Sequence, residues 1–213
     1  KLANYISCYR HEKNLSSVPS IMPGTGAELI FYPDNLSSSI VVSRHQPFCL
    51  EYTHSQIFSV RIRHHALRYF FPMSIQELAD KTVSVTDIWG KKGQIFLYRL
   101  AESINLYEII TLVEDFLFIN LMEKSADYWL DNALNILYNQ RQNSNNLSRA
   151  IISSEKSVRQ FQNMIKRSTG VSPKYFQRTA RFQYTLRKLL SNSPNNFLNI
   201  ALDHGYYDQA HFI

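Results

Sequence analysis

Two stretches, SVRQFQNMIKRSTG (residues 157–170) and NFLNIALDHGYYDQAHFI (residues 196–213), decide the fold that this sequence predicts. In the second stretch, apolar residues recur at helical spacing as far as Gly205, whose freedom to take a positive φ suits the end of a helix. Asp208 can then cap a new helix. A helix, a tight turn and a second helix with small polar residues in its first turns are typical of a helix-turn-helix that enters the DNA major groove.

The first stretch repeats this plan earlier in the chain, behind a supporting helix whose apolar side contains Leu147, Ala150 and Ile151. Ser157 can cap the helix that follows, and Gly170 ends it. We expect one apolar stripe of this helix to be buried, consisting of Val158, Phe161, Met164 and Ile165. The sequence therefore predicts two helix-turn-helix units.

A long basic helix is expected between the two units. Ser172 and Pro173 start it, because proline suits the first turn of a helix, and KYFQRTARFQYTLRKLL continues it. Its core side is expected to consist of Phe176, Ala180, Phe182, Leu186, Leu189 and Leu190. Such a helix spans roughly 25 Å. With its flanking helices it could set two recognition helices about one DNA turn, roughly 34 Å, apart.

Exposed positions of the two recognition helices are the candidates for DNA contact. Arginine, glutamine and asparagine can form bidentate hydrogen bonds with base edges, whereas cations and hydroxyl groups bind phosphates. The predicted base-reading residues are Arg159, Gln160, Gln162, Asn163, Gln209, Ala210 and His211. The predicted phosphate-binding residues are Ser157, Lys166, Arg167, Lys174, Arg178 and Arg181. The alternative for each side chain is an ordinary solvated polar group.

At these residues the sequence resembles the AraC family of bacterial transcription regulators. The matching positions are Ser157, Arg159, Phe161, Lys166, Gly170, Ser172, Pro173, Phe176, Arg181, Leu189, Leu190, Ile200, Ala201, Gly205, Tyr206, Asp208, Gln209, Ala210 and Phe212. Where the family has glycine in the turn of the first unit, this chain has Glu155, and we expect the second recognition helix to be incomplete at Ile213. The resemblance implies a double helix-turn-helix domain that binds double-stranded promoter DNA, with RNA polymerase as a further candidate partner.

Charge is distributed unevenly along the 213 residues, whose formal net charge is +6. From residue 141 onward there are 11 Lys and Arg against 3 Asp and Glu, a net of +8; before it there are 12 against 14, a net of −2. The basic excess lies in the predicted DNA-binding part, where phosphate contacts would make affinity depend on salt. A solvated basic surface explains such a charge run by itself, but together with the paired motifs it favours DNA.

The N-terminal part is a different kind of sequence, in which short β-rich runs alternate with turn clusters, as in a small antiparallel barrel or sandwich. Residues 21–31 and 66–121 resemble the sensor-like N-terminal domain of some AraC-type regulators, an abbreviated cupin-like barrel with appended helices. The predicted fold is therefore α+β. A cupin-like β-barrel domain over residues 1–124 is followed by a helix and linker over 125–146 and an all-α double helix-turn-helix domain over 147–213.

A small-molecule effector would need a pocket in the first domain. Polar residues expected on strands near a barrel mouth are Tyr32, His45, Tyr52, His54, Arg61 and Arg63. Because Arg61 and Arg63 alternate with apolar neighbours, they also fit the wet side of a half-buried strand. No cupin H-x-H pattern, nucleotide-binding glycine motif or hydrolase motif is present, and His64 and His65 would point to opposite sides of a strand. We therefore expect no metal, no cofactor and no catalysis.

Residues 104–124 are expected to form a helix that is apolar on nearly every side. One side can pack on the barrel, and another can meet the same helix of a second subunit in a two-fold dimer, unless one subunit buries all of it. Glu108, Glu114 and Asp115 interrupt its apolar run, so we expect no membrane span. Two cysteines and the lack of a signal peptide fit a reducing cytoplasm, and the family resemblance implies that this cytoplasm is bacterial.

Together these patterns favour a sequence-specific transcription regulator that is controlled by a signal at its N-terminal domain. The alternative is a protein-interaction module that is recruited to DNA and has no small-molecule ligand. A pocket lined by convergent polar groups would favour the first function. A closed and fully packed domain would favour the second.

Overall fold

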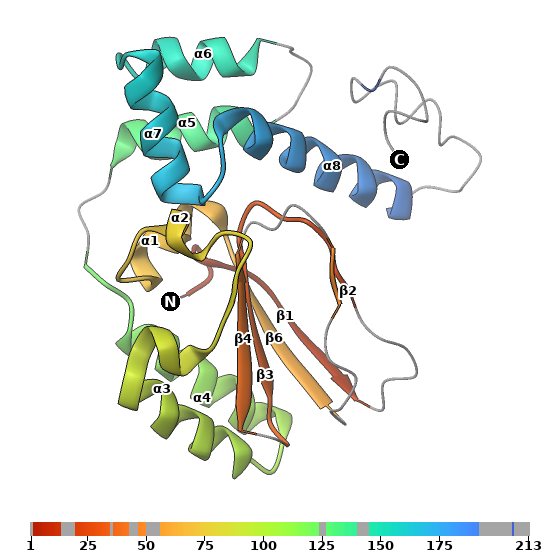
Figure 1. Cartoon of the computed structure of the whole chain (residues 1–213). Helices are drawn as coiled ribbons and strands as arrows, with labels where there is room; N and C mark the ends of the chain where they lie inside the picture. Colours follow the sequence, from red (N-terminus) through yellow and green to blue (C-terminus); the bar gives the residue numbers. More distant parts are fainter. Residues whose placement is uncertain are drawn as a thin grey trace. The chain divides into compact units, whose positions relative to one another are not determined.

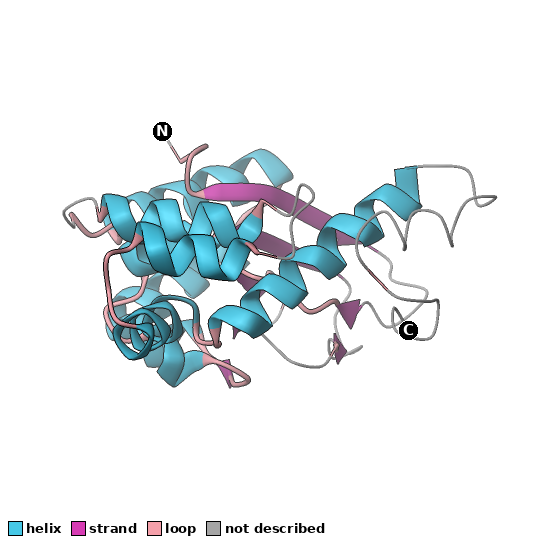
Figure 2. Cartoon of the chain, turned by 90° about the horizontal axis from the view of Figure 1, so that it is seen from above, coloured by secondary structure: helices cyan, strands magenta, loops and turns pink. Residues whose placement is uncertain are grey.

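The computed structural model describes residues 2–13, 20–34, 36–42, 47–49, 56–123, 127–139, 145–191 and 206. The chain divides into two compact units (Figure 1), one of Lys1–Ser125 with Ser168–Gly170 and one of Ala126–Arg167 with Val171–Ile213. The described strands all belong to the first, which we call the sheet unit. The described residues of the second, the helical unit, contain helices and connecting turns (Figures 1 and 2).

An antiparallel sheet organises the sheet unit. Its five strands, in the order β1-β6-β3-β4-β7, are β1 (Ile6–Lys13), β6 (Gln56–Ile62), β3 (Ala27–Tyr32), β4 (Ser37–Val42) and β7 (Thr82–Val83). A separate pair consists of β2 (Ser20–Ile21) and β5 (Phe48–Cys49). Within the described strands this sheet is open, and a closed barrel, as the sequence led us to expect, is not seen. Residues 43–46 and 50–55, on either side of β5, lie outside the described part of the chain.

Strand β3 is buried along its whole length because both faces of the sheet are covered there. Leu29 and Phe31 belong to the main hydrophobic core, whereas Ile30 and Tyr32 belong to a small second cluster with Ile21 and Ile57. Successive side chains of a strand point to opposite faces, so a strand that is apolar on both sides must lie inside. The charged exception in AELIFY is Glu28.

Helices complete the main core of the sheet unit. They are a 3-10 helix (His64–Ala66), α1 (Leu67–Phe70), α2 (Ile75–Leu78), α3 (Val85–Ala101) and α4 (Leu106–Ile119). Ser84 and Asp87 form a capping box at the start of α3, and the side chain of Asn105 caps α4. Within α3 the backbone is non-helical at Gly90, where φ is 55°. Helix α4 is thus shorter than the helix expected over residues 104–124.

His64 and His65 lie on the 3-10 helix and not on a strand, which corrects the expectation for this pair. His64 is only 8% exposed, and its ring meets the ring of His65 edge-on. Burial lowers the pKa of His64 to about 3, and the positive charges of His65 and Arg63 act in the same direction. The His64 imidazole is therefore neutral in the folded protein at physiological pH.

Acidification should destabilise the sheet unit through His64. Its pKa rises from about 3 in the folded protein to 6.5 in the unfolded chain, so the unfolded state binds the proton more tightly. The stability is fully present above pH 6.5 and is lost as pH falls toward 3, by at most about 1.4 kcal/mol per pH unit. Urea titrations between pH 7 and pH 5, followed by Trp89 fluorescence in a Trp129→Phe background, measure this slope. His64→Gln should flatten it, His65→Gln should keep it, and equal slopes in parent and His64→Gln would exclude this role.

The helical unit contains α5 (Tyr128–Tyr138), α6 (Asn146–Ser153), α7 (Val158–Thr169) and α8 (Pro173–Ser191). All four helices contribute to one hydrophobic core, to which α5 supplies Leu130, Ala133, Leu134 and Leu137. The sequence had placed residues 125–146 in a separate helix-and-linker segment. In the structure α5 packs inside the helical unit, next to α6 and α8.

No helix in the part of the chain that the structure describes combines the length and the apolar character that a membrane crossing requires.

Candidate nucleic-acid interface

Helices α6 and α7 are joined by a tight turn with one residue in the left-handed region. Glu155 has a φ of +54° and donates its backbone N–H to the carbonyl of Ile152 over 3.2 Å. The buried Ser154 braces the same turn, because its hydroxyl donates to the carbonyl of Ile151 at 2.6 Å and accepts from the N–H of Lys156 at 3.3 Å. Glu155 thus adopts the backbone conformation for which glycine is best suited, and glycine is the residue that the family named in the sequence analysis has in this turn.

Glu155→Gly should stabilise the helical unit by about 0.5–1 kcal/mol, because relief of the left-handed strain exceeds the entropy that glycine loses on folding. Trp129 fluorescence in urea titrations, in a Trp89→Phe background, measures this change. The matched control is Lys156→Gly, at an exposed neighbour without a positive φ, which should destabilise by about the same amount. A loss of stability in both variants would contradict the strain at Glu155.

Helix α7 begins with a capping box. The hydroxyl of Ser157 accepts from the N–H of Gln160 at 3.3 Å, and the side-chain oxygen of Gln160 accepts from the N–H and the hydroxyl of Ser157 at 3.1 and 3.0 Å. This arrangement satisfies backbone groups that have no partner within the helix. It also holds two predicted DNA-binding side chains at the cap, so Gln160 would have to leave the cap to reach a base.

The buried side of α7 covers a shorter length of the helix than the predicted stripe. Phe161 and Ile165 are fully buried and Met164 is half-buried, but Val158 is 54% exposed, which corrects the prediction for that residue. Val158 is the first residue of the helix and is not part of the core cluster to which Phe161 and Ile165 belong. The periodicity placed Val158 on the same side of the helix as Phe161 and Ile165, but the core begins only at Phe161, one turn after Val158.

The outward side of α7 carries four of the predicted DNA-binding residues. Arg159, Gln162, Asn163 and Lys166 are all exposed and follow one another at i, i+3, i+4 and i+7. Residues at this spacing lie on one face of a helix. Arg167 is also exposed but lies on the flank of this face. We call Arg159, Gln162, Asn163 and Lys166 the reading face.

Helix α8 follows through Gly170, whose φ of +84° ends α7 as predicted. The hydroxyl of Ser172 caps α8 by accepting from the N–H of Tyr175 at 3.2 Å, and Pro173 occupies its first position. Among the predicted phosphate-binding residues, Lys174 and Arg178 are exposed and Arg181 is half-buried.

The predicted core side of α8 is buried only in its first half. Phe176 and Ala180 are buried, whereas Phe182, Leu186 and Leu189 are half-buried and Leu190 is 80% exposed. Of these, the core cluster of the helical unit contains only Phe176. Near its C-terminal end, α8 is instead tied to α5 by a hydrogen bond of 2.9 Å from the guanidinium of Arg187 to the hydroxyl of Tyr138, a contact that the sequence did not predict.

Most of the second predicted helix-turn-helix, including Gln209, Ala210 and His211, lies outside the described residues. Tyr206 is described and buried, and the Arg181 guanidinium lies 6.0 Å from the centre of its ring. Burial raises the pKa of the Tyr206 hydroxyl, although the positive charge of Arg181 opposes this shift. Tyr206 therefore packs as a neutral phenol beside a residue of α8.

Three of the six residues predicted for an effector pocket, Tyr32, Arg61 and Arg63, lie in the described part of the sheet unit. Tyr32 is buried in the small cluster of β2, β3 and β6, and the Nε of Arg63 donates to the carbonyl of Ile6 at 3.1 Å. His45, Tyr52 and His54 lie outside the described residues. Arg61 is engaged by Glu28, as described next.

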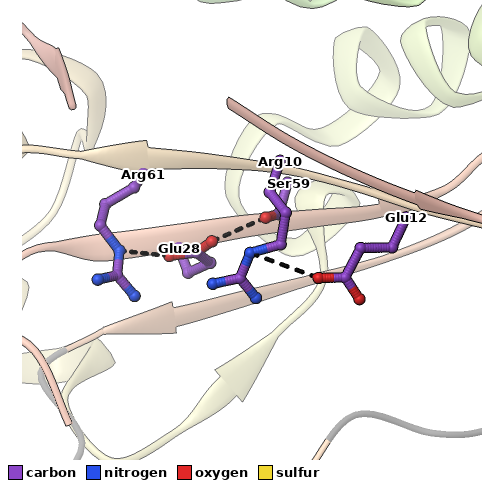
Figure 3. A network of polar contacts seen from close by, with 5 residues as sticks. All are labelled: Arg10, Glu12, Glu28, Ser59 and Arg61. Atoms are coloured by element: carbon purple, nitrogen blue, oxygen red, sulfur yellow. Dashed lines mark hydrogen bonds and ion pairs between the residues drawn. The ribbon is translucent and has the colours of Figure 1, made fainter. Parts of the chain in front are cut away.

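A polar cluster joins two neighbouring strands of the sheet, β3 and β6, at Arg61 (Figure 3). The Nε of Arg61 donates to one carboxylate oxygen of the buried Glu28, and the hydroxyl of Ser59 donates to the other, each over 2.7 Å. A looser ion pair of 3.7 Å joins Arg10 and Glu12 on β1. The sequence did not single out Glu28 or Ser59. The only local signal was one carboxylate within an otherwise apolar strand, and its partner becomes evident only from the register that sets Glu28 opposite Arg61.

Comparisons with known proteins bear on the fold of this chain. No family model matches this sequence, and no curated protein matches it. A match to a solved structure is consistent with the mixed helix-and-sheet fold of this chain. That structure is apo ToxT K231A from Vibrio cholerae strain SCE256, with a TM-score of 0.52, 10% sequence identity, and coverage of 97% of this chain and 91% of the other. At such low identity the likeness shows the fold alone.

Proposed function

We propose that this protein is a sequence-specific, DNA-binding transcription regulator of the AraC type, acting on promoter DNA in the bacterial cytoplasm. The observation that carries the proposal is the reading face of α7. It presents Arg159, Gln162, Asn163 and Lys166 to solvent on a rigidly capped helix, behind a tight turn from α6. An arginine can form two hydrogen bonds with the major-groove edge of guanine, and a glutamine or asparagine can do the same with adenine. The lysine can bind a phosphate.

The remaining predicted residues extend this proposal along the helical unit. Lys174, Arg178 and Arg181 on α8 are assigned to phosphates, and a second recognition helix with Gln209, Ala210 and His211 is assigned to the neighbouring major-groove segment. The net charge of +8 from residue 141 onward supports attraction to DNA over the whole unit. A signal at the sheet unit would control promoter binding or contact with RNA polymerase.

A second candidate function concerns the sheet unit alone. It could bind another protein, with no small-molecule ligand, while the helical unit recruits it to DNA. Two observations favour this reading over an effector pocket: Tyr32 is used in packing, and Arg61 is used in the pair with Glu28. Selection of sites from a random DNA pool with the full-length protein tests the function common to both candidates.

Arg159→Ala should reduce discrimination between a selected site and its single-base variants by about 1–3 kcal/mol, because one bidentate base contact is lost. Competition titrations at fixed salt measure this discrimination. Lys174→Ala is the matched control from the same unit: it should weaken binding to all sequences alike and lower the salt slope by about one. If Arg159→Ala selects and ranks sites as the parent does, the reading face is wrongly assigned.

A further inference from the structure

An apolar side chain lies exposed at the very start of helix α7. Val158 is the first residue of this helix and is 54% exposed. It belongs neither to the core cluster of the helical unit nor to the half-buried apolar residues that pack against that cluster. Valine is also a weaker helix former than most residues, because its branched side chain loses freedom in a helix. Neither burial nor helix propensity therefore accounts for a valine at this position.

Single exposed apolar residues are common on proteins, and what distinguishes Val158 is its place beside the reading face. Val158 adjoins Arg159 and precedes Gln162 by four residues. Side chains at i and i+4 of a helix are neighbours, with roughly 6 Å between their Cβ atoms. Phe161 and Ile165, which are fully buried, lie on the other flank of Val158. Val158 thus lies at the edge of the reading face, between Gln162 and the core side of the helix.

The capping box fixes this end of α7. The hydroxyl of Ser157 accepts from the N–H of Gln160 at 3.3 Å, and the side chain of Gln160 accepts from the N–H of Ser157 at 3.1 Å, so the backbone around Val158 is held on both sides. Side chains of a helix point back toward its N-terminus, and in a helix-turn-helix the first residues of the recognition helix are the ones that contact base edges. Val158 is therefore presented at the end of α7 that would enter the groove.

The side chain of Val158 can recognise only an apolar group. It has no hydrogen-bond donor or acceptor, so it cannot bind a phosphate or a polar base edge. The major-groove edges of the four base pairs carry one apolar group, the C5 methyl group of thymine. An apolar side chain gains free energy where it removes such a group from water.

We propose that Val158 is a specificity-determining residue, whose side chain packs on the C5 methyl group of a thymine. This inference rests on the proposed function, because it requires α7 to lie in the major groove. The spacing of roughly 6 Å between Val158 and Gln162 corresponds to one or two base-pair steps of about 3.4 Å. The thymine therefore lies within about two base pairs of the base that Gln162 contacts.

Single thymine-to-uracil replacements in a DNA site that the full-length protein selects test this contact, because deoxyuridine lacks only the methyl group. Gln162→Ala locates the base pair that Gln162 contacts, as the position where discrimination is lost. At a thymine within about two base pairs of it, uracil should weaken binding by the parent about three- to fivefold, which corresponds to the burial of one methyl group.

The variants of Val158 then assign this effect to its side chain. Val158→Ala should bind the thymine and uracil sites equally, and Val158→Ile should keep the preference for thymine. Leu190→Ala, which shortens another exposed apolar side chain of the helical unit, is the matched control and should also keep the preference. Unchanged binding of Val158→Ala to non-specific DNA shows that this variant is folded.

The outcomes separate this contact from the proposed function. A parent that selects no DNA sequence would overturn both. If the parent selects a site but no thymine in this interval depends on its methyl group, the contact of Val158 is excluded and the reading face still stands on the result for Arg159→Ala. The same follows if Val158→Ala prefers thymine as the parent does, or if Leu190→Ala loses the preference as well.

Discussion

Arg61→Met is expected to destabilise the sheet unit by about 3 kcal/mol, because it leaves the carboxylate of Glu28 buried without its cation. Glu28 is 3% exposed and would keep only the hydrogen bond from Ser59. We expect this loss of stability to lie at the lower end of the range for breaking a buried ion pair, because the Arg61 side chain itself is 30% exposed. Urea titrations followed by Trp89 fluorescence, in the Trp129→Phe background, measure it.

The double variant Glu28→Met/Arg61→Met should recover most of this loss, because an apolar pair of similar volume leaves no buried charge. The two single variants and the double variant form a thermodynamic cycle, whose coupling energy isolates the pair from changes in packing. A single Arg61→Met variant within about 0.5 kcal/mol of the parent would show that Glu28 does not depend on Arg61.

Phe161→Ala is expected to cost the helical unit about 3–5 kcal/mol, because it removes a fully buried ring from the core that all four helices share. The sequence pattern put Val158 in the same stripe, so Val158→Ala is the matched control. With Val158 54% exposed, that change should stay within about 0.5 kcal/mol of the parent. Trp129 fluorescence in the Trp89→Phe background measures both, and equal losses would mean that the core extends to the first turn of α7.

The local signals of the helical unit were predictable from the sequence. Ser157 caps α7, Gly170 takes a positive φ, and Ser172 starts the next helix, and each of these features depends on residues that are close in the sequence. How far a core extends along a helix is not a local property, and the prediction that Val158 is buried was therefore wrong.

Non-local features were the part that the sequence did not predict. Alternating apolar residues indicated strands, but whether a sheet closes depends on which strands pair, here β1 with β6 and β6 with β3. The pair of Glu28 and Arg61 depends on the same register, so Arg61 looked available for a ligand when considered alone. The reading face remains a prediction, since exposure shows that its side chains are accessible and does not show what they bind.

The place of α5 in the helical core has a consequence for how such proteins could exchange parts. A recombination event that joined residues 147–213 to a different N-terminal domain would leave behind Leu130, Ala133, Leu134 and Leu137, against which α6 and α8 pack. The transferred helices would then lack the part of their hydrophobic core that α5 supplies. We therefore expect a functional fusion to be joined before Tyr128, so that α5 stays with the helices that follow it.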